Sequence, residues 1–184
     1  MIRNILNIVN LFMFMLIFVL LSCDNNNTNI NQFVQQEVAQ KDIKESLEKA
    51  NRYMLIQEAE LINDYIERHD LNVIQTGTGL RYQIHNQGDG VFIKEGDIVT
   101  LEYEVRLLNG DLIYSSKNDG NKTFLVGRGG VESGLEEAIL KLCKHSVATL
   151  ILPAHLAHGL IGDGKKVPPR ATLVYRLKVV DKHR

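Results

Sequence analysis

Val99 to Ser115 has the sequence VTLEYEVRLLNGDLIYS, and this stretch carries the strongest signal for the fold. Apolar residues alternate with charged ones between Leu101 and Leu107, a pattern typical of a strand with one buried and one solvated face. Asn109-Gly110 follows at once, and this pair is the short sequence that most favours a tight hairpin turn. We therefore expect the segment from Leu112 to Ser115 to return antiparallel beside the first strand.

The flanking sequence predicts further strands and one short helix. Strands are expected at Leu80 to Ile84, Ser146 to Leu152 and Ala171 to Val180, where short apolar runs lie between turn residues. Ser133-Gly134-Leu135-Glu136 has the spacing of a capping box, which predicts a helix beginning there. Four or more antiparallel strands with one inserted helix give an α+β domain, expected over residues 70–184. The apolar face of the short helix would consist of Leu135, Ala138, Ile139 and Leu142.

An amphipathic helical arm is predicted over residues 33–69, which contain neither proline nor glycine. Apolar residues recur there at steps of three and four with one gap, as on one face of a helix or of two helices in series. They are Ile43, Leu47, Ala50, Met54, Leu61 and Tyr65. This stripe needs a partner, and two remain open: the carboxy-terminal domain of the same chain, or a second copy in a homodimer formed through residues 33–69.

The amino terminus has the pattern of an export signal. Its apolar run from Leu11 to Leu21 is too short to span a bilayer core, which needs about 20 residues. The run ends in Leu20-Leu21-Ser22-Cys23, which resembles the lipobox of bacterial lipoproteins; the alternative is an uncleaved signal anchor with an incidental cysteine. The resemblance implies a lipoprotein signal peptide over residues 1–22 and a lipid anchor on Cys23. It also implies a place in the cell envelope, on a bacterial membrane facing the periplasm. The polar residues that follow predict a flexible tether over residues 23–32.

The composition argues against several classes of function. The 184 residues carry a formal net charge of -1, so no excess of positive charge is available for a phosphate backbone, and we expect no nucleic-acid partner. Two cysteines are too few for a disulfide-rich scaffold. Cys143 lies in an apolar segment and is expected to pack as a small buried residue rather than to act as a nucleophile.

The sequence also lacks the common catalytic and cofactor motifs. Gly127-Arg128-Gly129-Gly130 does not have the spacing of a dinucleotide site, and no GxSxG nucleophile elbow occurs. His155 and His158 are three residues apart, but they lack the nearby cysteine or carboxylate cluster of a zinc site. Enzymes that depend on a nucleophile, a nucleotide or a metal are therefore disfavoured, and no metal or cofactor is expected.

From Gly96 to Val180 the sequence resembles the FKBP-type peptidyl-prolyl cis-trans isomerases. Ile151 to Gly159 (ILPAHLAHG) and Val167 to Tyr175 (VPPRATLVY) are specific in combination. Four further segments occur in the family's order: VTLEY from Val99, NGD to SS from Asn109, FLVG from Phe124 and VESGLEE from Val131. With its lipobox and charged arm, the chain also resembles FKBP-type lipoproteins of Bacteroidetes, including gliding-associated ones.

The resemblance implies an antiparallel sheet of about five strands wrapped on one short helix. It also implies a peptidyl-prolyl isomerase that binds proline-containing polypeptides and needs no cofactor. The backbone N–H of Glu132 would hold a substrate carbonyl, and His158 would hydrogen-bond the bound chain. By position, the walls and floor of the proline pocket would be Tyr103, Ile113, Phe124, Val131, Leu135, Val167 and Tyr175.

The chain departs from the family's pattern at four positions of this pocket. Leu135 replaces the usual tryptophan floor, and Ile113 replaces a phenylalanine. Tyr114 replaces an aspartate, and His158 replaces a tyrosine. A smaller floor loosens contact with the proline ring, and a lost carboxylate removes a polar group from the wall. Two hypotheses follow: an envelope isomerase that assists the folding of exported proteins, or a catalytically weak FKBP-like peptide-binding chaperone or docking module of an envelope complex.

Overall fold

The computed structural model describes residues 26–183, and their side chains from residue 40 onward. The predicted signal peptide, residues 1–22, and the predicted lipid attachment site, Cys23, lie outside the described residues. The chain divides into two compact units after Met54. The described part of the first unit is helical throughout, and the second unit contains the strands.

Helix α2 spans Asn26–Arg68 as one helix rather than two in series. It begins inside the predicted tether, so the prediction of a tether is wrong for residues 26–32. Asparagine and threonine favour caps and turns, but no proline or glycine between Asn26 and Arg68 ends the helix. Within the described part of the chain, none of the helices combines the length and hydropathy that a membrane crossing needs.

The carboxy-terminal turns of α2 belong to the second unit and pack on its sheet. Ile62 and Tyr65 are buried beside Ile151 and Val174, in a small cluster separate from the main core. The sequence predicts the boundary between arm and domain at residues 69 and 70. The packing instead divides the chain after Met54, which is earlier in the sequence.

The predicted apolar stripe of α2 is only partly correct. Tyr65 is buried as expected, but Leu61 is 57% exposed, and the adjacent Ile62 faces the sheet in its place. Leu61 and Ile62 are both apolar, so periodicity alone does not distinguish which of them points inward. Nearer the amino-terminal end of α2, Ile43 and Leu47 are exposed as well.

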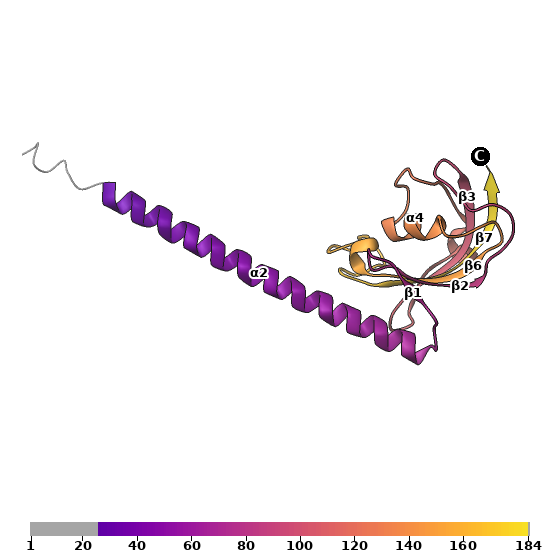
Figure 1. The fold of residues 1–184 in the computed structure, drawn as a ribbon, viewed down its shortest axis with the longest axis horizontal. Coiled ribbons are helices and arrows are strands. Elements are labelled where there is room, and N and C mark those ends of the chain that lie inside the picture. Colours follow the sequence, from indigo (N-terminus) through magenta and orange to yellow (C-terminus); the bar gives the residue numbers. More distant parts are fainter. Residues whose placement is uncertain (1–25, 184) are drawn as a thin grey trace, which may run out of the picture. The chain divides into compact units, whose positions relative to one another are not determined.

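The second unit is built on a seven-stranded antiparallel sheet, which confirms the α+β prediction (Figure 1). The strand order is β1-β2-β6-β7-β3-β4. Strand β4 pairs with the end of β3, and β5 pairs with its beginning. The two strands beyond the expected five, β1 and β5, have two and four residues, too few for a pattern to show. The strands are β1 Ile74–Gln75, β2 Arg81–Asn86, β3 Ile98–Leu107, β4 Leu112–Ser115, β5 Lys122–Leu125, β6 Val147–Leu152 and β7 Leu173–His183.

Strand β3 follows the predicted alternation and hairpin. Its apolar residues face the core while Glu102 is exposed, and it pairs with β4 through the turn at Asn109 and Gly110. Gly110 has φ of 95°, a left-handed conformation that glycine adopts without strain, and the Asn109 side chain accepts a hydrogen bond from the Asp111 N–H at 3.0 Å. The hairpin prediction is therefore confirmed.

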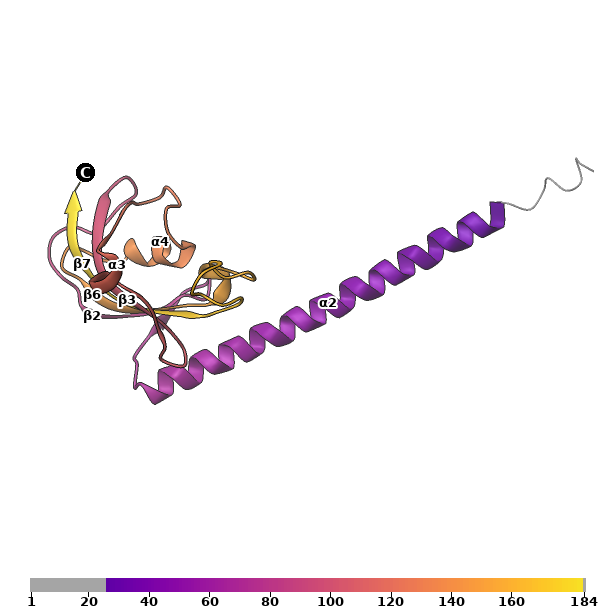
Figure 2. The same ribbon diagram turned by 180° about the vertical axis from the view of Figure 1, so that it is seen from behind.

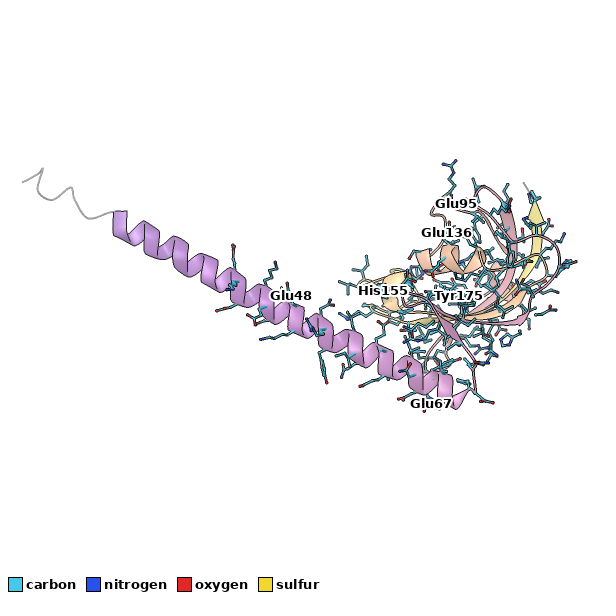
Figure 3. All side chains as sticks on the ribbon, viewed as in Figure 1. Glu48, Glu67, Glu95, Glu136, His155 and Tyr175 are labelled. Atoms are coloured by element: carbon cyan, nitrogen blue, oxygen red, sulfur yellow. The ribbon has the colours of Figure 1, made fainter. Side chains whose placement is uncertain are left out.

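The sheet curves around helix α4, Ser133–Ile139, whose apolar side packs into the main core (Figures 1 and 2). The predicted capping box is wrong by its first residue: the helix is preceded by Glu132, and Ser133 is already helical. Glu136, labelled in Figure 3, instead accepts hydrogen bonds from the backbone N–H groups of Gly127 and Gly129, at 2.8 and 3.1 Å. The other short helices are α3, Ser116–Asp119, and the 3-10 turn η1, Ala154–Leu156.

Candidate active site

A cavity of about 340 Å³ lies among β3, β4, β5 and the loop that joins β6 to β7. Aromatic, basic and acidic side chains line it: Tyr103, Tyr114, Asp119, Lys122, Glu132, His158, Asp163 and Lys165. A neighbouring hollow of about 520 Å³ shares Lys122, Glu132 and His158 with it. These three charged or polar residues therefore stand between the two hollows.

Glu132 is the centre of a polar network. It directly precedes α4, and its side chain is 7% exposed. Its Oε1 accepts a hydrogen bond from the Tyr175 hydroxyl at 2.6 Å and lies 3.2 Å from Nε2 of His158. Its Oε2 lies 3.6 Å from Nζ of Lys122 and has no hydrogen-bond partner within the described part of the chain. One buried carboxylate thus joins α4, β5, β7 and the β6–β7 loop.

Lys122 places its ammonium group against two aromatic rings. Its Nζ lies 5.3 Å from the ring centre of Tyr103 and 5.6 Å from that of Tyr175, and the two rings are 6.4 Å apart. An ammonium over an aromatic face is attracted by the negative potential of the ring. The aromatic faces that the sequence predicts for a proline ring are therefore occupied by the end of a lysine side chain.

The network fixes the protonation of its members. Burial raises the pKa of Glu132, but Lys122, the Tyr175 hydroxyl, the residue's own backbone N–H and His158 together hold that pKa below its usual range. Burial, together with the neighbouring Glu132 carboxylate, raises the pKa of Tyr175 well above its usual value. Near neutral pH, Glu132 is therefore an ionised acceptor and Tyr175 a neutral donor.

A second polar pair forms the other side of the cavity. The Tyr114 hydroxyl donates a short hydrogen bond to the carboxylate of Asp163, which also accepts from the backbone N–H groups of Lys165 and Val167, both at 2.8 Å. The bond to Asp163 raises the pKa of Tyr114 to about 12. Burial by itself raises the pKa of Asp163, but the hydrogen bonds have a larger, opposite effect and lower that pKa to about 2.

Comparisons with known proteins identify the domain that carries this cavity. The family model of FKBP-type peptidyl-prolyl cis-trans isomerases matches residues 90–180. FK506-binding protein 1 of Debaryomyces hansenii is 38% identical over 102 residues, which cover 54% of this chain and 90% of that protein. The chain belongs to the FKBP-type peptidyl-prolyl cis-trans isomerase family.

Two further FKBP-family proteins are similar to this chain over a smaller part of their own length. The probable FKBP-type isomerase FkpA of Neisseria meningitidis serogroup B is 42% identical over 106 residues, 57% of this chain and 38% of that protein. FK506-binding protein 2 of Yarrowia lipolytica is 34% identical over 88 residues and is covered over 61% of its length, so the chain spans less than two thirds of either protein.

Solved FKBP structures share the fold. The crystal structure of FkpA from Escherichia coli matches with a TM-score of 0.61 and 25% identity, over 86% of this chain and 74% of that one. The crystal structure of AtFKBP13 matches with a TM-score of 0.59 and 27% identity, over 61% of this chain and all of that one.

The FKBP domain brings four of the ten predicted pocket residues to the cavity: Tyr103, Tyr114, Glu132 and His158. Tyr175, labelled in Figure 3, belongs to the buried core, and its hydroxyl bonds to Glu132, which lines the cavity. Val131 lines the neighbouring hollow. The remaining four do not line the cavity: Phe124, Leu135 and Val167 belong to the buried core, and Ile113 packs against it.

Two expectations about individual residues of the FKBP pocket can be compared with the cavity. Leu135 is fully buried in the core and is not among the residues that line the cavity, so its place as the pocket floor stays a prediction. Replacement of the family's aspartate by Tyr114 does not remove a carboxylate from the wall, because Asp163 supplies one from the β6–β7 loop.

Sequence reasoning missed four residues that line the cavity of this FKBP domain: Asp119, Lys122, Asp163 and Lys165. Asp163 lies in Gly162-Asp163-Gly164, a segment that has the composition of a turn. Lys122 lies only two residues before Phe124, but nothing local indicates that its side chain turns toward Tyr103. His155 and His158, considered for zinc, have different partners: His155 is bonded to the Thr78 carbonyl at 2.8 Å, and His158 faces Glu132.

Proposed function

We propose that the chain is a peptidyl-prolyl cis-trans isomerase that acts on proline-containing polypeptides. The observation that carries the proposal is the cavity in which Tyr103 presents aromatic surface beside the buried Glu132, within a domain of the FKBP family. No side chain in the cavity has to act as a nucleophile for this reaction, because isomerisation breaks no covalent bond.

The reaction requires only that the twisted amide is bound better than the planar one. The barrier of an X-Pro bond, about 18 to 20 kcal/mol, comes from amide resonance, which is lost on twisting. In the proposed mechanism Tyr103 contacts the proline ring, while the network of Tyr175, Glu132 and His158 holds the walls in place. Lys122 must then move its ammonium away from the rings when the substrate binds.

The proposal is tested by the isomerisation rate of a proline tetrapeptide with leucine or phenylalanine before the proline. We expect the full chain, purified in detergent, to accelerate this rate in proportion to its concentration. A rate equal to that in buffer with detergent would reject the enzyme. Bovine serum albumin at the same concentration controls for unspecific acceleration by protein surfaces.

We further propose that the isomerase acts in the bacterial cell envelope on exported proteins, anchored by lipid on Cys23. The support is the sequence Leu20-Leu21-Ser22-Cys23 at the end of the apolar run. Metabolic labelling with a radioactive fatty acid tests the anchor: the wild-type chain should carry label in the membrane fraction, and Cys23→Ser should lose it. Equal labelling of Cys23→Ser and wild type would contradict the assignment.

A peptide-binding chaperone with weak turnover is the second candidate. It is favoured by Lys122, whose ammonium occupies the aromatic faces that a proline ring needs. Such a protein would suppress aggregation of an unfolded client at concentrations where it leaves the tetrapeptide rate unchanged. The homodimer through residues 33–69 remains a proposal that light scattering tests: a mass of one chain would exclude it.

A further inference from the structure

Glu58, on the part of α2 that belongs to the second unit, binds both ends of the loop that joins β6 to β7. Its Oε1 accepts a hydrogen bond from the backbone N–H of Ala154 at 2.7 Å. The same oxygen accepts a hydrogen bond from the hydroxyl of Thr172, also at 2.7 Å. Ala154 follows β6 by two residues, and Thr172 directly precedes β7. One carboxylate oxygen therefore connects residues near the start and at the end of the loop.

The loop between these two residues carries one side of the candidate active site. It contains His158 and Asp163, which line the cavity. The hydrogen bonds inside the loop continue from the anchored end toward these residues: the Gly159 N–H donates to the Ala154 carbonyl at 2.7 Å, and the Arg170 N–H donates to the Gly159 carbonyl at 2.9 Å. A displacement of Ala154 is thus passed directly to the residue that follows His158.

The surroundings of Glu58 hold its carboxylate in place. Ile62, one turn farther along α2, is buried against the sheet, so this part of the helix has a fixed position on β6 and β7. The carboxylate also interacts favourably with Arg81, which is 7% exposed on β2. Thr172 is 5% exposed, so its hydroxyl has little access to water and depends on the acceptor that Glu58 provides.

We infer that Glu58 is a positioning residue of the isomerase: it fastens both ends of the β6–β7 loop and thereby sets the places of His158 and Asp163 in the cavity. Its hydrogen-bond partners Ala154 and Thr172 are not among the residues that line the cavity, and it acts through them. The catalytic part of this inference rests on the proposed isomerase function, whereas the fastening of the loop does not.

The experiment compares the full-length Glu58→Ala, Glu58→Gln and Glu60→Ala variants with the wild type. Glutamine keeps a carbonyl oxygen that can accept both bonds, and Glu60 is exposed on the same helix, which makes it a matched control. Hydrogen exchange by mass spectrometry reports on the loop peptides and on β3. Tetrapeptide kinetics report kcat and KM separately, and thermal unfolding shows that each variant is folded.

In Glu58→Ala we expect the amides of residues 154–172 to exchange about tenfold faster while those of β3 keep their protection. We expect kcat/KM to fall roughly tenfold in the same variant, since a misplaced wall weakens transition-state contacts. Glu58→Gln should recover most of both losses, and Glu60→Ala should resemble the wild type. A Thr172→Val variant, which removes only one of the two bonds, should give an intermediate exchange rate if Glu58→Ala does not fold.

Unchanged exchange of the loop in Glu58→Ala, or in Thr172→Val where that variant replaces it, would overturn the inference whatever the activity. A faster loop with unchanged kcat/KM would overturn the positioning role. If the wild type itself shows no turnover, the proposed function fails, but the exchange comparison still decides whether Glu58 fastens the loop.

Discussion

The Nζ of Lys122 lies 3.6 Å from Oε2 of Glu132, an oxygen without a hydrogen-bond partner in the described part of the chain. The ammonium that compensates this buried carboxylate also lies over the rings of Tyr103 and Tyr175. In the proposed mechanism a proline ring on Tyr103 competes with the Lys122 ammonium for the same aromatic surface. Lys122 then influences both the charge of the site and its availability to a substrate.

Replacement of Lys122 by alanine should lower the KM for a proline tetrapeptide. A cation over aromatic rings contributes about 1 kcal/mol, so removing the competitor should lower KM roughly fivefold. Lys117→Ala is the matched control, since Lys117 is exposed on α3 and its replacement changes the net charge equally. An unchanged or higher KM in Lys122→Ala, relative to this control, would contradict the competition.

The pair of Tyr114 and Asp163 should give a measurable dependence of stability on pH. The folded-state pKa of Asp163 is about 2 against an ordinary value of 3.8, so its contribution to the free energy of unfolding is present above about 4 and is lost as pH falls toward 2. The pKa of Tyr114 is about 12 against 10.0, so its contribution is present below 10 and is lost as pH rises toward 12.

Urea unfolding at a series of pH values checks this dependence. Asp163→Asn should show a smaller loss of stability than the wild type between pH 4 and 2, whereas Asp42→Asn, at an exposed site on α2, should follow the wild type. Tyr114→Phe should show a smaller loss between pH 10 and 12. Parallel curves for the wild type and Asp163→Asn in acid would show that the carboxylate has no such role.

Leu135→Trp, which restores the residue usual in the family, should not improve catalysis. Leu135 is fully buried in the core, and a larger side chain in a filled core costs about 1 to 3 kcal/mol. We expect lower stability in urea and no gain in kcat/KM. Leu140→Trp, at a 39% exposed position after α4, is the control and should cost less. A stable and faster Leu135→Trp would contradict this expectation and support Leu135 as the pocket floor.

The glycines of the β6–β7 loop should differ in their tolerance of alanine. Gly162 and Gly164 have φ of +71° and +70°, so alanine is strained at both. A Cβ at Gly162 would lie 2.1 Å from the Val167 carbonyl oxygen, whereas a Cβ at Gly164 meets nothing within 4 Å. Gly162→Ala should therefore lower kcat/KM and stability well beyond Gly164→Ala. Equal effects in tetrapeptide kinetics and thermal unfolding would exclude the clash.

Ile62→Ala should destabilise the domain, and Leu61→Ala should not. Ile62 is 1% exposed and packs on the sheet, so truncation to alanine should cost about 2 to 5 kcal/mol. Leu61 is 57% exposed, and its truncation should change the free energy of unfolding by about 0.5 kcal/mol or less. Urea unfolding monitored by circular dichroism distinguishes them, and equal costs would contradict the observed face of α2.

The fold was predictable where local patterns and burial agree. The alternation before Asn109-Gly110 predicts the β3–β4 hairpin, which the structure contains. The same logic failed for β1 and β5, because strands of two and four residues are too short for periodicity. Periodicity also assigned Leu61 rather than Ile62 to the buried face of the helix. Two adjacent apolar residues do not indicate which of them packs on a sheet formed later in the chain.

The site was less predictable than the fold. Family order located Tyr103 and His158 at the cavity, but the side chain of Glu132 was overlooked in favour of its backbone N–H. Lys122 and Asp163 were missed because their roles depend on partners brought together by the sheet and by the β6–β7 loop. Such pairings follow from tertiary structure, and neither residue stands out in its local sequence.

The most direct test of the isomerase is exchange NMR on a Leu-Pro peptide with the full chain at a substoichiometric concentration. Without protein, cis and trans forms interconvert over tens to hundreds of seconds, so no exchange cross-peaks appear at mixing times of about one second. We predict cross-peaks that grow with protein concentration and that weaken when Tyr103 is replaced by alanine. Spectra identical to those of the peptide alone, at every protein concentration, would contradict the proposed function.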